Sequence, residues 1–176
     1  EGDIEQVILQ GDAQFIEGSK IANADTIRYD DRQEMTFLEG NAVYQDDGQY
    51  IESDRIRYDT KDESVQTEGR SRIVDDAQIL VADQIDYDNV AQVGLAQGNV
   101  FWVDTVEQIT IRCENAVYDK ATDYLKATGG RPLMTTLVDG DTLYLAADTL
   151  VSFRPQNNPD TSATILPDSL ALLTDS

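Results

Sequence analysis

Glycine recurs along this chain at a fixed interval. Gly11, Gly40, Gly69 and Gly98 are spaced 29 residues apart, and Gly129 follows 31 residues later. A constant period of this length indicates one supersecondary unit copied in tandem, because a single short unit cannot bury its own apolar face. The period therefore predicts a stack of similar units, and such a stack presents an elongated surface or groove.

A second series keeps step with the glycines. Each copy contains a phrase that begins with an acidic residue and ends in Tyr-Asp; the four phrases are Asp25–Asp30, Asp54–Asp59, Asp83–Asp88 and Glu114–Asp119. Apolar residues alternate on either side of the acidic residue, but their parity breaks there, as between Ser53 and Ile56. Such a break is typical of a bulge or bend in a strand.

Each copy divides into three short extended segments. In the segment Gly40–Tyr44, alternation places Ala42 and Tyr44 on one face, and no helical period is sustained anywhere in the chain. β-branched and aromatic residues dominate the segments. The sequence therefore predicts an all-β protein with about 14 to 16 short strands.

The acidic residues at the parity break form a column when the copies are aligned: Asp25, Asp54, Asp83, Glu114 and Asp148. Stacked carboxylates are unfavourable unless they face solvent or accept hydrogen bonds from the backbone at the bend. A ladder of calcium ions is the alternative, since aligned aspartates can share cations. The nine-residue glycine and aspartate spacing of calcium-binding solenoids is missing, which favours a structural role at the bend.

The charge and composition of the chain limit the classes of molecule that it is expected to bind. The chain has 34 acidic and 13 basic residues, a formal net charge of −21. This surface repels nucleic acid and anionic membranes, because both are bound through Lys and Arg. The simplest interpretation of this net charge is that it keeps the protein soluble and has no more specific role. No run of about 18 apolar residues is present, so no membrane-spanning segment is predicted.

The residue types also argue against catalysis. The chain has no histidine and one cysteine, which removes histidine-dependent triads, most zinc sites and any internal disulfide. Cys113 stands in a column filled elsewhere by Ala24, Ser53 and Ala82, so a small buried side chain is expected there. Carboxylate-pair chemistry stays open among so many acidic residues, but nothing marks out one pair. We therefore predict a non-enzymatic protein without catalytic residues, metal or cofactor.

The repeats define the expected organisation. Residues 1–153 form one repeat-built domain, and the Pro-, Asn-, Ser- and Thr-rich residues 154–176 read as a linker or disordered tail. The stack should have open edges at Ile4–Leu9 and Thr142–Phe153, which are either blunted by charge or used for end-to-end assembly. The residues from Glu1 onward are compatible with a chain that never carried a signal peptide and with one that has lost it.

The repeat resembles a known family. Gly40–Tyr44 reads Gly-Asn-Ala-Val-Tyr, and Ile51–Tyr58 reads Ile-x-Ser-Asp-x-Ile-x-Tyr. This pattern, which recurs over Gly98–Tyr118, resembles the OstA-like repeat of the LptA family, of LptC and of the periplasmic N-terminal domain of LptD. The resemblance covers residues 1 to about 153.

The resemblance implies a twisted β-jellyroll of about five copies of the 29-residue unit, open at both ends and apolar inside. It implies a non-enzymatic role in outer-membrane biogenesis of Gram-negative bacteria, in which the groove shields the acyl chains of lipopolysaccharide or a related lipid. It also implies a periplasmic location, with or without outer-membrane association, a signal peptide already removed, and end-to-end contacts with itself or other OstA-like domains.

Carried onto this sequence, the resemblance implies a groove lined by Phe15, Ala22, Ile27, Tyr29, Tyr44, Ile51, Ile56, Tyr58, Leu80, Ile85, Tyr87, Trp102 and Ile111. In any β-stack the same columns are simply core. Contacts to lipid phosphates would require basic residues near the rim, and the candidates are Arg28, Arg57, Arg70, Arg72 and Lys126.

Other classes remain open at this point. A right-handed β-helix that acts on or binds polysaccharide has a similar period. The Tyr-Asp pairs suggest a fragment of a YD-repeat shell, although the glycine-rich turn of that family is missing here. A structural scaffold module of a larger assembly is the third alternative.

Overall fold

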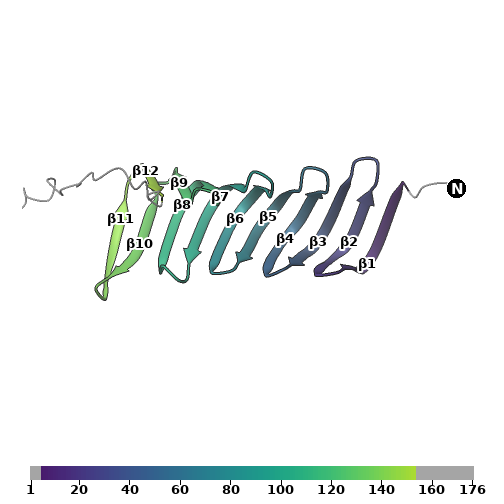
Figure 1. Ribbon diagram of the computed structural model, residues 1–176, viewed down its shortest axis with the longest axis horizontal. Helices are drawn as coiled ribbons and strands as arrows, with labels where there is room; N and C mark the ends of the chain where they lie inside the picture. Colours follow the sequence, from purple (N-terminus) through teal and green to yellow (C-terminus); the bar gives the residue numbers. More distant parts are fainter. Residues whose placement is uncertain (1–4, 154–176) are drawn as a thin grey trace, which may run out of the picture.

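The computed structural model describes residues 5–153, which form one antiparallel sheet. Its strands are β1 (Gln6–Glu17), β2 (Lys20–Asp30), β3 (Met35–Asp46), β4 (Gln49–Asp59), β5 (Ser64–Asp75), β6 (Gln78–Asp88), β7 (Val93–Asp104), β8 (Ile109–Asp119), β9 (Tyr124–Thr128), β10 (Leu133–Val138), β11 (Asp141–Ala146) and β12 (Thr149–Ser152). Strands β1 to β8 pair in chain order, and Figure 1 shows them side by side in one row.

This architecture confirms the predicted all-β fold and its open ends. Because all strand pairs of residues 5–153 are antiparallel, the parallel coils of a β-helix are excluded for this part of the chain. The same residues contain no helix long and apolar enough to cross a membrane. The predicted tail at 154–176 lies outside the described residues.

The number of strands differs from the expectation. The described residues form 12 strands because two of the three predicted segments join into one; β3, for example, runs continuously through Gly40. Gly40 and Asn41 have φ angles of 77° and 48°, a backbone shape that glycine adopts without steric cost. The strand therefore bends at this point and does not end.

Each bend is a β-bulge placed opposite the acidic column. In the β3–β4 pair, Gly40 and Asn41 together face the single residue Asp54, and the same two-against-one register occurs in the β1–β2, β5–β6 and β7–β8 pairs. A bulge of this kind bends its strand and increases the local twist. The predicted coincidence of bend and acidic column is confirmed for Asp25, Asp54, Asp83 and Glu114, whereas Asp148 lies between β11 and β12 and not at a bulge.

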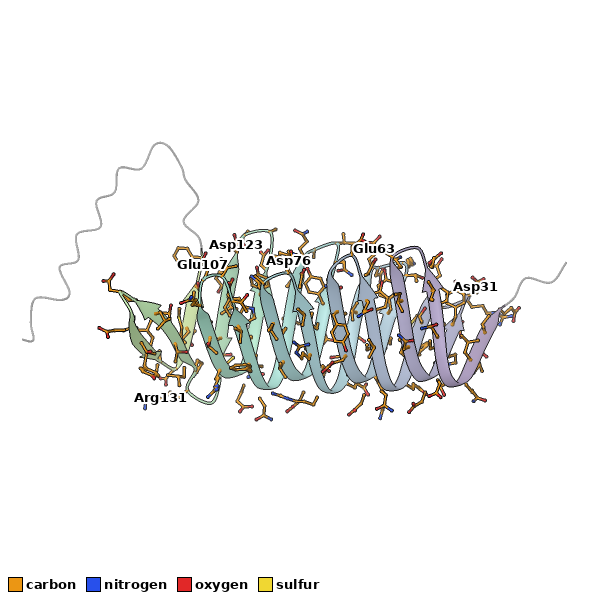
Figure 2. The ribbon with its side chains drawn as sticks, turned by 90° about the horizontal axis from the view of Figure 1, so that it is seen from below. Asp31, Glu63, Asp76, Glu107, Asp123 and Arg131 are labelled. Carbon is orange, nitrogen blue, oxygen red and sulfur yellow. The ribbon has the colours of Figure 1, made fainter. Side chains whose placement is uncertain are left out.

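The aligned bulges fold the sheet into a trough with two arms. The first arm ends in the turns at 18–19, 47–48, 76–77 and 105–108, and the second arm in those at 31–34, 60–63, 89–92 and 120–123. Figure 2 shows turn residues of both arms, such as Asp31 and Asp76, along one long edge, with Arg131 from the bend along the opposite edge. The two lines of turns are thus the rims of the mouth of the trough.

The acidic side chains pack against the glycines of the neighbouring unit. A Cβ atom added to Gly98 would lie 2.6 Å from Asp83 Oδ2, and the equivalent atoms on Gly40 and Gly69 would overlap the carboxylates of Asp25 and Asp54. Glycine is therefore required here for space as well as for its φ angle.

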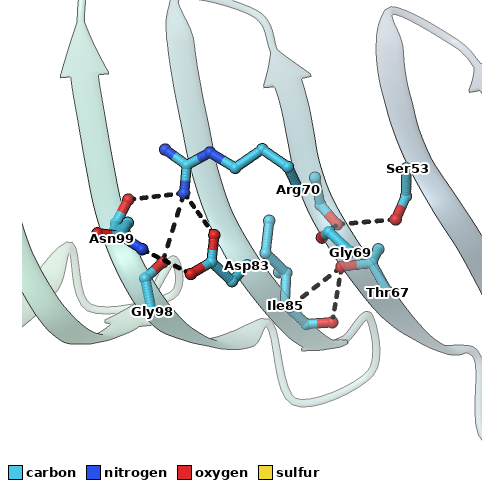
Figure 3. Close-up of polar contacts among 9 residues, drawn as sticks. Ser53, Thr67, Gly69, Arg70, Asp83, Ile85, Gly98 and Asn99 are labelled. Carbon is cyan, nitrogen blue, oxygen red and sulfur yellow. Dashed lines mark hydrogen bonds and ion pairs between the residues drawn. The ribbon is translucent and has the colours of Figure 1, made fainter.

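The hydrogen-bond donors to the carboxylates at the bend are side chains. The sequence had suggested backbone N–H groups as the donors instead. Asn99 Nδ2 donates to Asp83 Oδ2 at 2.7 Å, and Arg70 Nη1 donates to Asp83 Oδ1 at 2.9 Å (Figure 3). Asn41 Nδ2 donates to Asp25 in the same way at 3.2 Å. Hydrogen bonds from Asn99, and secondarily from Arg70, lower the pKa of Asp83. The carboxylates of Asp25 and Asp83 thus have the predicted structural role at the bend.

The core lies between the arms. The inward isoleucines Ile51, Ile85 and Ile111 are at most 2% exposed, and each contributes about 1.5–3 kcal/mol by burial. One apolar cluster fills the half nearer β1 and a second the half nearer β9. Between the two clusters, the buried hydroxyl oxygens of Ser53 and Ser71 lie 2.8 Å apart and share a hydrogen bond. Every buried polar side-chain atom of the described residues has a hydrogen-bond partner.

We expect Gly98→Ala to lower the free energy of unfolding more than Gly48→Ala does. Both glycines have positive φ, which costs alanine about 1–2 kcal/mol. Only Gly98 has a carboxylate against it, whereas nothing lies within 4 Å of a Cβ on Gly48. The crowding should add about 1–3 kcal/mol in urea titrations. Equal losses in the two variants would show that the carboxylate contact is unimportant.

Candidate functional site

The interior of the trough is the candidate site, and its free volume is uneven. A chamber of about 450 Å³ lies at the β1 end, whereas the central cavity measures about 70 Å³ and the cavity nearer β12 about 230 Å³. The columns that line all three spaces come from equivalent positions of the repeat. The differences therefore come from individual side chains.

The chamber at the β1 end, called the N-terminal chamber below, is lined by both arms. Its walls are predominantly apolar and aromatic: Val7, Leu9, Phe15, Ala22, Ile27, Tyr29, Leu38, Tyr44 and Tyr58, with Glu17, Lys20, Thr36 and Thr60 as the polar residues. Phe15 of β1 is 45% exposed, because no strand formed by residues 5–153 covers this end of the stack. The chamber is therefore continuous with the open end of the trough.

Two tyrosines from opposite arms meet in this chamber. The rings of Tyr44 and Tyr58 stack with centroids 6.1 Å apart and an interplanar angle of 17°. Burial, and then the nearby Asp46 carboxylate, raises the pKa of Tyr44; burial also raises the pKa of Tyr58. Both phenols are therefore neutral at physiological pH, so they add no charge to the apolar wall.

The centre of the trough is almost filled. Tyr87 takes the place that Tyr58 has in the preceding unit, but it faces Gly94, where a Cβ would lie 3.2 Å from the ring. The missing side chain lets the Tyr87 ring lie against the neighbouring strand β7, and Leu80, Trp102 and Tyr118 line the same cavity. These bulky residues account for the small central volume.

The mouth above the centre is bridged by polar contacts. Lys120 Nζ, in a turn of the second arm, lies 2.9 Å from Asp75 Oδ2 at the end of the first arm. Beside this ion pair, Gln78 Nε2 of the first arm approaches Tyr118 OH of the second at 3.5 Å. The two arms are thus joined across the mouth at this level.

The basic residues lie elsewhere than expected. Arg70 bonds Asp83 at the bend, and Arg28 stacks on Phe37 at 3.7 Å on the face opposite the inward Leu38. Arg70, Arg112 and Arg131 line a shallow depression of about 590 Å³ at the bend. The lysines that line the interior cavities are Lys20 and Lys120, which the sequence analysis did not select. Of the five basic residues that the sequence suggested for the rim, Arg70 is thus held at the bend and Arg28 against Phe37, and none of Arg28, Arg57, Arg70, Arg72 and Lys126 lines the three interior cavities.

The predicted lining residues all line or underlie the interior. Phe15, Ala22, Ile27, Tyr29, Tyr44 and Tyr58 line the N-terminal chamber; Ile51, Leu80, Ile85, Tyr87 and Trp102 line the central cavity; Ile111 and again Trp102 line the cavity near β12. Ile56 is part of the core beneath the N-terminal chamber. Whether these residues contact a ligand stays a prediction.

Sequence reasoning missed a second inward column. Leu38, Thr67, Ala96 and Ala127, each at most 2% exposed, come from the segments that precede the glycines. The sequence pattern of this column is weak, because its positions hold leucine, threonine and alanine. In addition, the alternation of inward and outward residues shifts at the bulge a few residues later. The exposed ends of the stack also contribute: Val7 and Leu9 of β1 line the chamber.

An open antiparallel stack with an apolar trough is the architecture of a groove-forming β-jellyroll. Residues 1–64 match the family model described as LptA/(LptD N-terminal domain) LPS transport protein. The resemblance to the OstA-like repeat of the LptA family that the sequence suggested is thereby confirmed over these residues.

A solved structure with a matching fold is that of LptH from Pseudomonas aeruginosa, the LptA homologous periplasmic component of the conserved lipopolysaccharide transport device of that bacterium. The match has a TM-score of 0.57 at 15% sequence identity and covers 78% of this chain and 94% of LptH. At this identity the likeness shows the fold alone. No curated protein sequence matches the chain significantly.

Cys113 should be unreactive in the folded protein. Its side chain is buried, as its column predicted, and burial raises the pKa of the thiol to about 11. The nucleophilic thiolate is therefore scarce at pH 8. We expect iodoacetamide to modify Cys113 at least about tenfold more slowly in buffer than in urea, since unfolding restores an ordinary thiol pKa. Equal rates, measured by mass spectrometry, would contradict the buried position.

Proposed function

We propose that this chain is a non-enzymatic periplasmic component of lipopolysaccharide transport, and that its trough shields the acyl chains of the lipid. The observation that carries the proposal is the N-terminal chamber, which offers about 450 Å³ of space between mainly apolar and aromatic walls and is open at the end of the stack. The family match at residues 1–64 points to the same process.

Simple transfer energetics explain how such a trough works. Each acyl-chain methylene moved out of water gains about 0.8 kcal/mol, so an apolar chain enters the chamber spontaneously. The neutral phenols of Tyr44 and Tyr58 provide flat, largely apolar surface, and the polar Lys20 and Thr60 at the same chamber leave a place for a hydrated headgroup. No bond is made or broken in this process, so the protein needs no catalytic residue.

The edges of the sheet support an extended assembly. β1 pairs only with β2, and β11 only with β10, so one side of each strand lacks a partner in the described chain. Ile8 and Ile16 on β1 are 52% and 61% exposed. We place a second copy of this chain or another OstA-like domain on such an edge, in the periplasm and reaching toward the outer membrane, so that the troughs join.

We expect a photo-crosslinking residue at Tyr29 or Tyr58 to capture purified lipopolysaccharide. Both side chains line the N-terminal chamber, where an inserted acyl chain would contact them. The matched control is Arg57, the exposed neighbour of Tyr58 in β4, which faces away from the chamber. Capture is measured as a mobility shift after irradiation.

Capture at Tyr29 and Tyr58 but not at Arg57 would support transport of lipid in the trough. If the folded protein captures no lipopolysaccharide at any of these positions, the lipid-carrier proposal is wrong. It would leave a scaffold or polysaccharide-binding module as the function to test.

We expect Ile8→Lys to reduce self-association. Lysine on an edge strand places a charge where another strand would have to dock, which disfavours edge-to-edge pairing. The control is Val90→Lys, because Val90 is 72% exposed but lies in a turn away from both edges. Sedimentation velocity over a concentration series should show weaker association for Ile8→Lys only. Unchanged association would remove β1 from the proposed interface.

A further inference from the structure

The trough is divided along its length although its repeats are equivalent. About 450 Å³ is free in the N-terminal chamber and about 70 Å³ at the centre. A lipid chain that fits the chamber therefore does not fit the centre as it stands. If lipid passes along the trough, the central part has to widen.

The side chains above the centre indicate what holds it narrow. The Asp75–Lys120 ion pair spans the mouth from one rim to the other, and both residues line the central cavity. The other ion pairs between residues 5–153 do not span the mouth: Arg55–Glu68 and Arg70–Asp83 lie at the bend, and Arg32–Glu5 and Arg28–Asp30 lie within the second arm.

The ion pair is suited to reversible opening. The side chains of Lys120 and Asp75 are 44% and 31% exposed, so water screens their attraction and can solvate both charges when they separate. Hydrogen bonding to Asp75 raises the pKa of Lys120, which keeps the ammonium charged at any physiological pH. A pair of this kind biases an equilibrium between two arrangements of the arms without locking either.

We propose that Asp75 and Lys120 form a latch across the mouth of the trough, which keeps its central part closed to lipid until the pair separates. The proposal rests on the proposed function, because it assigns a regulatory role within the same lipid-binding trough. Lipid then occupies the N-terminal chamber without disturbing the latch, and it reaches Tyr87 and Trp102 only when the two rims move apart.

The test compares lipid capture at two depths of one trough. A photo-crosslinking residue replaces Tyr29 in the N-terminal chamber or Tyr87 at the centre, and purified lipopolysaccharide is the probe. Each position is combined with Lys120→Gln, with the charge swap Asp75→Lys/Lys120→Asp, or with Arg55→Gln. The last variant is the matched control, because it removes the exposed Arg55–Glu68 pair (2.8 Å) at the bend.

The latch predicts that Lys120→Gln raises capture at Tyr87 about two- to fivefold, the factor by which an exposed ion pair can shift an equilibrium. The charge swap should return capture to the level of the parent chain, and Arg55→Gln should leave it unchanged. Capture at Tyr29 should be the same in all variants. The double variant Asp75→Cys/Lys120→Cys, bridged by a bismaleimide in a Cys113→Ala background, should reduce capture at Tyr87 to background.

Equal capture at Tyr87 in the parent, Lys120→Gln and bridged proteins would overturn the latch. An equal rise in Arg55→Gln would do the same, because it would indicate general loosening of the fold. Both outcomes leave capture at Tyr29 intact and so are distinct from failure of the proposed function. Absence of capture at Tyr29 in the parent protein would overturn the proposed function and the latch with it.

Discussion

The contact of an acidic side chain with a glycine of the next unit is the constraint on which the shape of this protein depends. Asp83 lies against Gly98 and accepts hydrogen bonds from Asn99 and Arg70, and equivalent contacts join Asp25 to Gly40 and Asp54 to Gly69. These contacts align the bulges of successive strands along one line. Because strands β1 to β8 all bend at the same level, the sheet folds lengthwise into a trough. An unbent sheet would expose both of its faces.

The trough gives one face of the sheet an interior without closing a barrel. Inward columns from both arms meet over a floor of small residues at the bend, such as Ala42, Ser71 and Ala82, which are at most 1% exposed. Small side chains there let the arms approach each other, and the larger residues nearer the rims then decide how much space is left. The same backbone can therefore be roomy at one end and packed in the middle.

The distribution of charge follows from the same geometry. Turns gather at the rims, and turn chemistry favours aspartate, so the mouth is flanked by carboxylates such as Asp31, Glu63, Asp76 and Asp123 (Figure 2). Much of the net charge of −21 is thus a consequence of having many turns on one edge. In this setting the interior-facing lysines Lys20 and Lys120 stand out as the groups that can interact with an anion or with the opposite rim.

The repeat, the all-β class, the bend at the acidic column and most of the inward face could be predicted from the amino-acid sequence, because these features follow from residue spacing within one unit. Tyr44, Ile51 and Ile85 could be placed from alternation alone. Three other features could be seen only in the folded chain: the segments around Gly40 form one strand, Asp75 contacts Lys120, and Tyr87 lies in the central cavity against Gly94. Asp75 and Lys120 are 45 residues apart and belong to opposite arms, so no local pattern records their contact. The cavity volumes depend in the same way on side chains from both arms, which meet only after the sheet has folded.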